Sequence, residues 1–148
     1  GKDEVKKNQD LVEKHKIIVG RFVPSNGELN VKPGEGYRVI TTPQILKPNE
    51  IHTETYIDVA ALDTEEEAIN YKAYLYSKFA RFLLRQSITS VNVTKECFSF
   101  IPLQDFTTNS DIDWNKSIPE IDRQLYKKYK LSKEEIAFIE RMIKPMSE

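Results

Sequence analysis

The segment from residue 63 to residue 86 constrains the fold of this chain more than any other. It reads DTEEEAINYKAYLYSKFARFLLRQ, with apolar residues at helical spacing, three glutamates near its start and an arginine near its end. Acids in the first turn and bases in the last suit the helix dipole, and Asp63 three residues before Glu66 fits a capping signature. The pattern predicts one long helix over residues 64–86.

Four shorter segments have the pattern expected of β-strands. The first contains the β-branched run Ile17, Ile18 and Val19, and the third alternates between two faces as a half-buried strand does. The predicted strands are residues 16–23, 37–40, 52–60 and 97–101. A loop rich in glycine and proline separates the first two of them.

The C-terminal part of the chain predicts two more helices. A proline suits the second position of a helix over 119–129, and Ser132 with Glu135 fits a second capping box before another helix. The expected fold is α+β: a twisted, mostly antiparallel sheet packed by one long helix, with a C-terminal pair of short helices. We expect 1–106 to form the α+β body and 107–148 a helical extension packed on or beside it, as one structural unit.

Composition excludes several classes of protein. With 148 residues, 39% hydrophobic and 30% charged, the chain is expected to form one soluble globular domain. No run approaches the roughly 18 apolar residues that span a membrane. One cysteine and two histidines give no metal-ligand spacing and fit a reducing compartment, so we expect a cytoplasmic location. A glycine at position 1 indicates a piece of a larger protein.

Motifs of catalysis are missing from the sequence. There is no nucleophile elbow, no phosphate-binding glycine-rich loop and no zinc helix. Cys97 stands between Glu96 and a phenylalanine, which favours an unreactive core thiol, and neither His15 nor His52 has a partner at a readable spacing. We therefore predict no catalytic residue and no metal site in this chain.

The stretch between Glu67 and Glu96 contains no acidic residue, which raises the possibility of a negatively charged partner. At 100° per residue, Lys78, Arg81 and Arg85 fall within about a 60° arc of the predicted helix. Such a stripe can bind phosphates. The same stripe also fits an ordinary solvated helix face, although such a face usually carries glutamates four residues from its bases.

Three stretches of the chain, taken in order, resemble a known family. They are TETYIDVAALDTEEEAINYKAYLYSKFARFLLR, VTKECFSFIPLQDF and LYKKYKLSKEEIAFIERMIKPM. They resemble the C-terminal part of fused bacterial type II restriction-modification enzymes, in which an adenine-specific DNA methyltransferase is followed by a target-recognition domain. The resemblance covers nearly the whole chain, from DLVEKHKIIVGRF onward.

The resemblance implies a function in DNA sequence specificity and not in catalysis. The methyltransferase tetrapeptide, Asn or Asp followed by Pro-Pro-Tyr or Pro-Pro-Phe, does not occur here. S-adenosylmethionine and Mg²⁺ are then expected only for the parent methyltransferase and endonuclease. The implied partners are double-stranded DNA and the methyltransferase domain of the same parent chain, with no membrane involved.

The implied DNA contacts form two sets. Basic side chains would hold the DNA backbone, and polar side chains from the loop-rich region 24–48 would read base edges. The expected backbone contacts are Lys78, Arg81, Arg85 and Lys95. The expected base-reading residues are Asn26, Asn30, Lys32, Arg38 and Gln44.

A second hypothesis is a protein-interaction module that docks the other domains of the parent enzyme. It predicts an exposed apolar stripe along EEIAFIERMI and no DNA binding at low salt. A nuclease would need a strand-borne acid pair followed by Glu-x-Lys, which no predicted strand offers.

Overall fold

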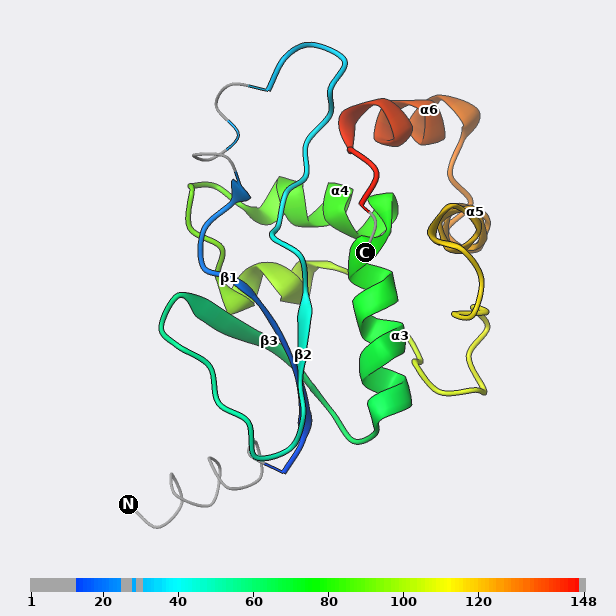
Figure 1. The fold of residues 1–148 in the computed structure, drawn as a ribbon. Coiled ribbons are helices and arrows are strands. Elements are labelled where there is room, and N and C mark those ends of the chain that lie inside the picture. Colours follow the sequence, from blue (N-terminus) through cyan, green and yellow to red (C-terminus); the bar gives the residue numbers. More distant parts are fainter. Residues whose placement is uncertain (1–12, 25–27, 29–30, 147–148) are drawn as a thin grey trace.

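The computed structural model describes residues 13–24, 28 and 31–146, and its fold is α+β, as the sequence predicts (Figure 1). Within these residues the structure has three strands, four α-helices and a 3₁₀ helix. The elements are β1 (His15–Gly20), β2 (Gln44–Leu46), β3 (Tyr56–Leu62), α3 (Glu65–Tyr76), α4 (Lys78–Ser87), η1 (Lys95–Phe100), α5 (Ile118–Lys128) and α6 (Lys133–Met142). None of the helices described is long and apolar enough to cross a membrane.

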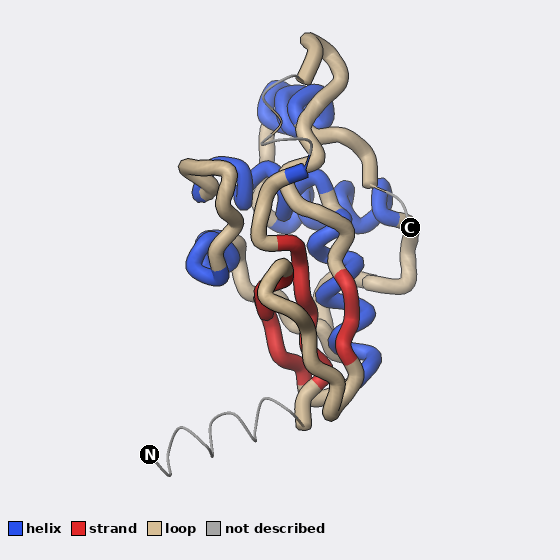
Figure 2. The backbone as a smooth tube through the Cα atoms, turned by 60° about the vertical axis from the view of Figure 1, so that its left-hand side comes forward, coloured by secondary structure: helices blue, strands red, loops and turns tan. Residues whose placement is uncertain are grey.

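The sheet has the order β2-β1-β3, and both pairs are antiparallel. Strand β1 is central, and its four middle residues are all buried because β2 and β3 flank it and α3 contacts all three strands. In Figure 2 the strands lie side by side. Since β1 runs against both neighbours, its last residue lies at the same end of the sheet as the first residues of β2 and β3.

The predicted single helix over 64–86 is wrong in one respect, because the chain forms two helices that meet at Ser77. This residue has φ −64° and ψ 146°, an extended conformation that ends α3 and begins α4. Its hydroxyl donates to the carbonyl of Tyr74 and accepts the N–H of Ala80 at 3.1 Å. The two helices therefore run in different directions in Figure 1.

The capping box of α3 is one residue later than predicted. Thr64, not Asp63, is the N-cap, and its partner is Glu67. The second capping box, Ser132 with Glu135 at the start of α6, is confirmed. Both boxes satisfy backbone N–H groups that a helix start would otherwise leave without a partner.

Two predicted strands have other structures. Residues 37–40 form only an isolated bridge between Tyr37 and Ile143, and Val39 has a left-handed φ of 77°. Residues 97–101 lie mostly in η1, where the adjacent Cys97 and Phe98 are both buried. A helical turn allows this, whereas a strand sends neighbouring side chains to opposite faces. Strand β2, which completes the sheet, was not predicted.

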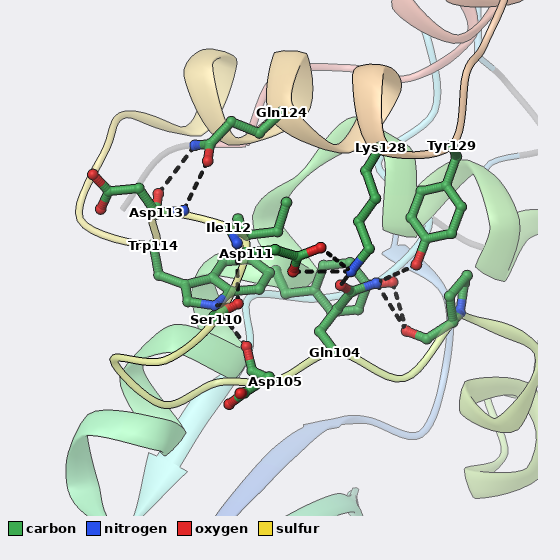
Figure 3. A network of polar contacts seen from close by, with 12 residues as sticks. Gln104, Asp105, Ser110, Asp111, Ile112, Asp113, Trp114, Gln124, Lys128 and Tyr129 are labelled. Atoms are coloured by element: carbon green, nitrogen blue, oxygen red, sulfur yellow. Dashed lines mark hydrogen bonds and ion pairs between the residues drawn. The ribbon is translucent and has the colours of Figure 1, made fainter.

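The described part of the C-terminal extension, residues 107–146, shares the core of the residues before it. The ring of Trp114 lies 5.7 Å from that of Tyr74 in α3 and 5.2 Å from that of Phe106, between centroids. Its indole N–H donates to the carbonyl of Asp105 at 2.9 Å (Figure 3). Further hydrogen bonds in Figure 3 join the same loop to α5. Aromatic packing and hydrogen bonds thus hold the extension against the α+β body.

Replacing Ser77 with alanine is expected to destabilise the protein by about 1–2 kcal/mol, because the cap of α4 and a buried hydrogen bond are both lost. Ser77 is completely buried, so water cannot replace its hydroxyl. Urea unfolding followed by circular dichroism measures the effect. Ser99→Ala, which removes an exposed hydroxyl from η1, is the control and should change stability by less than about 0.5 kcal/mol.

Candidate nucleic-acid interface

The predicted basic stripe is not an exposed surface. Arg81, at its centre, is completely buried, so it cannot contact a DNA phosphate in this conformation. The three bases all belong to α4, and their face is covered because α5 and α6 pack against that helix. Tyr71 and Tyr74 of the preceding helix, α3, are buried as well.

Arg81 instead binds two backbone carbonyls inside the protein. Its Nη2 donates to Tyr76 at 3.0 Å, and its Nη1 donates to Arg38 at 3.3 Å. Burial lowers the pKa of Arg81 to about 10, while the negative charges of Asp122 and Glu28 oppose that shift. The guanidinium remains protonated at neutral pH, so a full positive charge lies in the interior.

Asp122 of α5 is buried, and its negative charge acts on Arg81 more strongly than that of Glu28. Its two carboxylate oxygens accept the N–H groups of Lys78 and Phe79, each at 3.0 Å, at the start of α4. Burial raises the pKa of Asp122 to about 6, although these two N–H groups and the charge of Arg81 favour the ionised form. Asp122 therefore caps α4 from a different helix.

The other three residues that were expected to contact the DNA backbone differ in their surroundings. Lys78 is 2.6 Å from a carboxylate oxygen of Glu140 in α6, and only 16% of its side chain is exposed. The guanidinium of Arg85 lies 3.8 Å above the ring centre of Tyr37, beside a pocket of about 320 Å³. Lys95 in η1 is exposed. Of the four residues, Lys95 has the exposure that a phosphate contact needs.

Two of the expected base-reading residues lie together. Arg38 and Gln44 line one pocket of about 550 Å³ at the end of the sheet where β1 finishes and β2 begins. We call it the sheet-end pocket; its lining residues are Gly20, Pro24, Arg38, Thr41, Thr42, Gln44, Thr55 and Tyr56. Lys32 is exposed but does not line it, and Asn26 and Asn30 lie outside the described residues.

Antiparallel pairing explains why residues distant in sequence meet at this pocket. Ile18 near the end of β1 pairs with Gln44, and Gly20 pairs with Tyr56. The N–H of Gly20 donates to the hydroxyl of Thr41 at 2.7 Å. A Cβ at position 20 would lie 2.8 Å from that oxygen, so the glycine lets the loop before β2 close over the strand end.

The polar groups of the sheet-end pocket suit hydrogen bonding to a ligand. The guanidinium of Arg38 donates to the hydroxyl of Thr42, which holds it at the pocket wall. Gln44 is exposed, and three threonines and Tyr56 also line the pocket. Donors and acceptors of these types can read the edges of bases. The threonines at 41, 42 and 55 were not among the predicted base-reading residues, and the adjacent pair Thr41 and Thr42 was the available signal.

His52 has a partner that its spacing in the sequence did not indicate. Its Nε2 lies 3.1 Å from the carboxylate of Asp58 in β3. A hydrogen bond with the carbonyl of Thr53 raises the pKa of His52, and Asp58 contributes in the same direction, against the effect of burial. The pair joins the loop before β3 to the strand itself. Across the described part of the chain, no three His, Cys, Asp or Glu side chains are grouped to hold a metal ion.

Comparisons with protein families, with curated proteins and with solved structures found no match to this chain. The resemblance to restriction-modification enzymes therefore remains a prediction from the sequence. Function has to be argued from the sheet-end pocket and its surroundings.

Proposed function

We propose that this chain is a DNA target-recognition unit of a type II restriction-modification enzyme, which contributes sequence specificity and no catalysis. The observation that supports the proposal best is the meeting of Arg38 and Gln44 in the sheet-end pocket. Arginine pairs through two hydrogen bonds with guanine, and glutamine with adenine. Both residues were expected to read bases before their positions in space were known.

In this proposal the pocket receives a base edge and the surrounding surface holds the DNA backbone. Arg38 presents donors, Gln44 presents a donor and an acceptor, and the hydroxyls of Thr41 and Thr55 adapt to either. Lys95 supplies a phosphate contact that carries no sequence information. S-adenosylmethionine and Mg²⁺ would be bound by the methyltransferase and nuclease parts of the parent enzyme, and the methyltransferase domain would be the protein partner of this chain.

Replacing Arg38 with alanine is expected to remove base preference more than total affinity. A good bidentate contact accounts for about 1–3 kcal/mol of discrimination between bases. The measurement is selection of bound duplexes from a random-sequence pool, followed by sequencing. Retention of the wild-type preference by Arg38→Ala would exclude this residue as a base reader.

Lys95→Ala is the matched comparison, because it removes an exposed lysine that is expected to contact the DNA backbone. It should weaken binding equally for all sequences and reduce the salt slope of the binding constant by about one. Arg123 on α5, 70% exposed, is the control for loss of a positive charge elsewhere. If the wild-type chain binds no duplex even at low salt, the proposed function is wrong.

The second candidate function is a protein-interaction module. The residues that favour it in the structure differ from those that the sequence indicated. Ile139 and Ile143 are buried, whereas Phe138 contacts Phe82 at 5.8 Å between ring centres and is still 43% exposed, so the expected apolar stripe on α6 is covered only in part. Among the other exposed apolar side chains, Phe100 at 70% and Leu103 at 91% lie close together in sequence. A protein-contact role would predict that substitutions at these two positions impair assembly with the parent enzyme.

A further inference from the structure

The backbone beside Arg38 has a conformation that needs an explanation. Val39 has a φ of 77° and is 1% exposed. A β-branched residue is unfavourable in the left-handed region, and such conformations persist only where the surrounding contacts impose them. The position follows directly on a residue of the sheet-end pocket. The contacts that impose it are therefore relevant to that pocket.

Two charged side chains from distant parts of the sequence hold this backbone. Both carboxylate oxygens of Glu28 lie 3.2 Å from the N–H of Val39, and one of them also accepts the N–H of Arg38. The carbonyl of Arg38 accepts from the buried guanidinium of Arg81. Both backbone polar groups of Arg38 are thus bound by charged partners, which form shorter and stronger hydrogen bonds than neutral ones.

The position of Arg81 depends in turn on the break between α3 and α4. Because α3 ends at Tyr76, the carbonyl of that residue is available as an acceptor, and Arg81 uses it for its second hydrogen bond. Asp122 fixes the start of α4, one turn before Arg81. A buried charge is unfavourable unless its donors find partners. The helix break provides the carbonyl of Tyr76 for Nη2, Nη1 reaches the carbonyl of Arg38, and Nε has no hydrogen-bond partner.

We propose that Arg81 and Glu28 are positioning residues for base reading, which fix the backbone of Arg38 and the strained Val39 so that the guanidinium of Arg38 stays beside Thr42 at the sheet-end pocket. This inference rests on the proposed function. Neither residue needs to touch DNA. Arg81, expected from the sequence to bind phosphate, acts through Arg38 instead.

Hydrogen exchange of the whole chain tests the positioning without DNA. In Arg81→Met and Glu28→Gln, the amides of Arg38 and Val39 should exchange at least roughly tenfold faster, because the contacts that oppose local opening are weakened. The amides of β1 and β3 should keep their wild-type protection. Unchanged protection at 38 and 39 in both variants overturns the positioning role. Arg123→Ala is the charge control and should leave these amides unchanged.

Selection from the random duplex pool tests the consequence for DNA. Arg81→Met and Glu28→Gln should each lose base preference by roughly tenfold, as Arg38→Ala does, while the salt slope stays at the wild-type value. Combining Arg38→Ala with Arg81→Met should add no further loss of preference, because both changes remove the same contact. If Arg81→Met folds poorly, Arg81→Lys replaces it. Lysine keeps the positive charge but cannot bind both carbonyls as the guanidinium does, so base preference should be lost while the salt slope is kept.

The outcomes separate the two proposals. Wild-type base preference in folded Arg81 and Glu28 variants overturns the positioning role and leaves the proposed function intact. Absence of DNA binding by the wild-type chain overturns the proposed function and the positioning role together, whatever the exchange rates show. Joint loss of preference and of local protection supports both.

Discussion

Replacing Asp122 with alanine is expected to lower the free energy of unfolding by about 3–5 kcal/mol, because it removes one partner of a buried charged group. The N–H groups of Lys78 and Phe79 lose the acceptor that now lies 3.0 Å from each. Arg81 also loses a negative charge that favours its protonated form. Since domains are typically stable by about 5–15 kcal/mol, this is a large share of the total.

The measurement is urea unfolding at pH 7 with two matched variants. Asp122→Asn keeps the shape and one carbonyl oxygen, so it should lose clearly less than Asp122→Ala. Arg123→Ala changes the neighbouring exposed residue of the same helix and should cost less than about 0.5 kcal/mol. A loss below about 1 kcal/mol in Asp122→Ala would contradict the role of this carboxylate as a buried cap.

The pH dependence of stability gives a second readout of Asp122. Its pKa is raised from 3.8 to about 6 in the folded protein, so the folded state binds the proton more tightly than the unfolded chain. The contribution of Asp122 to the free energy of unfolding is therefore fully present below pH 4 and is lost as the pH rises through about 6. Relative to Asp122→Asn, the wild type should lose on the order of 2 kcal/mol between pH 4 and pH 7. Equal slopes in the two proteins would contradict the raised pKa.

The pairing of Asp122 with α4 explains the acid-poor stretch of the sequence. The sequence has no acid between Glu67 and Glu96, and this absence suggested an external negative partner. In the structure the acids come from the C-terminal helices: Asp122 acts on Arg81, and Glu140 binds Lys78. Asp122 is 41 residues from Arg81, and Glu140 is 62 residues from Lys78. Local spacing could not reveal partners at these separations.

The fold class was predictable because it depends on local pattern, and the helix break was not. Charged first turns, capping boxes and β-branched runs are read from neighbouring residues. Ser77 lies within a continuous helical pattern, and nothing in its neighbours separates a mid-helix serine from one that caps the next helix. The break is decided by tertiary contacts, since Asp122 supplies acceptors to the first residues of α4.

The sheet-end pocket was predictable in its residue types and not in its geometry. Arg38 and Gln44 stood out as polar residues of a loop-rich region, and their meeting depends on the pairing of β1 with β2, a strand that the sequence pattern did not indicate. The role inferred for Arg81 depends on contacts 43 residues apart. Side chains that act through other residues have no local signature.

Replacing Trp114 with alanine is expected to destabilise the whole chain by about 3–5 kcal/mol, the usual cost of removing a buried tryptophan. Its ring packs against Tyr74 and Phe106. Its N–H donates to the carbonyl of Asp105 (Figure 3). Because Tyr74 belongs to α3, the change should weaken the body and the C-terminal extension together. Urea unfolding followed by circular dichroism measures this, since the variant has no other tryptophan to report by fluorescence.

Two variants separate packing from hydrogen bonding at this position. Trp114→Phe keeps an aromatic ring and loses the N–H donor, so it should cost about 1–2 kcal/mol. Phe100→Ala removes an exposed ring, 70% accessible, and should change stability by less than about 0.5 kcal/mol. A single transition, shifted to lower urea in Trp114→Ala, is expected because one aromatic cluster joins both parts of the chain. Two separate transitions, with the body unaffected, would show that residues 107–148 unfold independently.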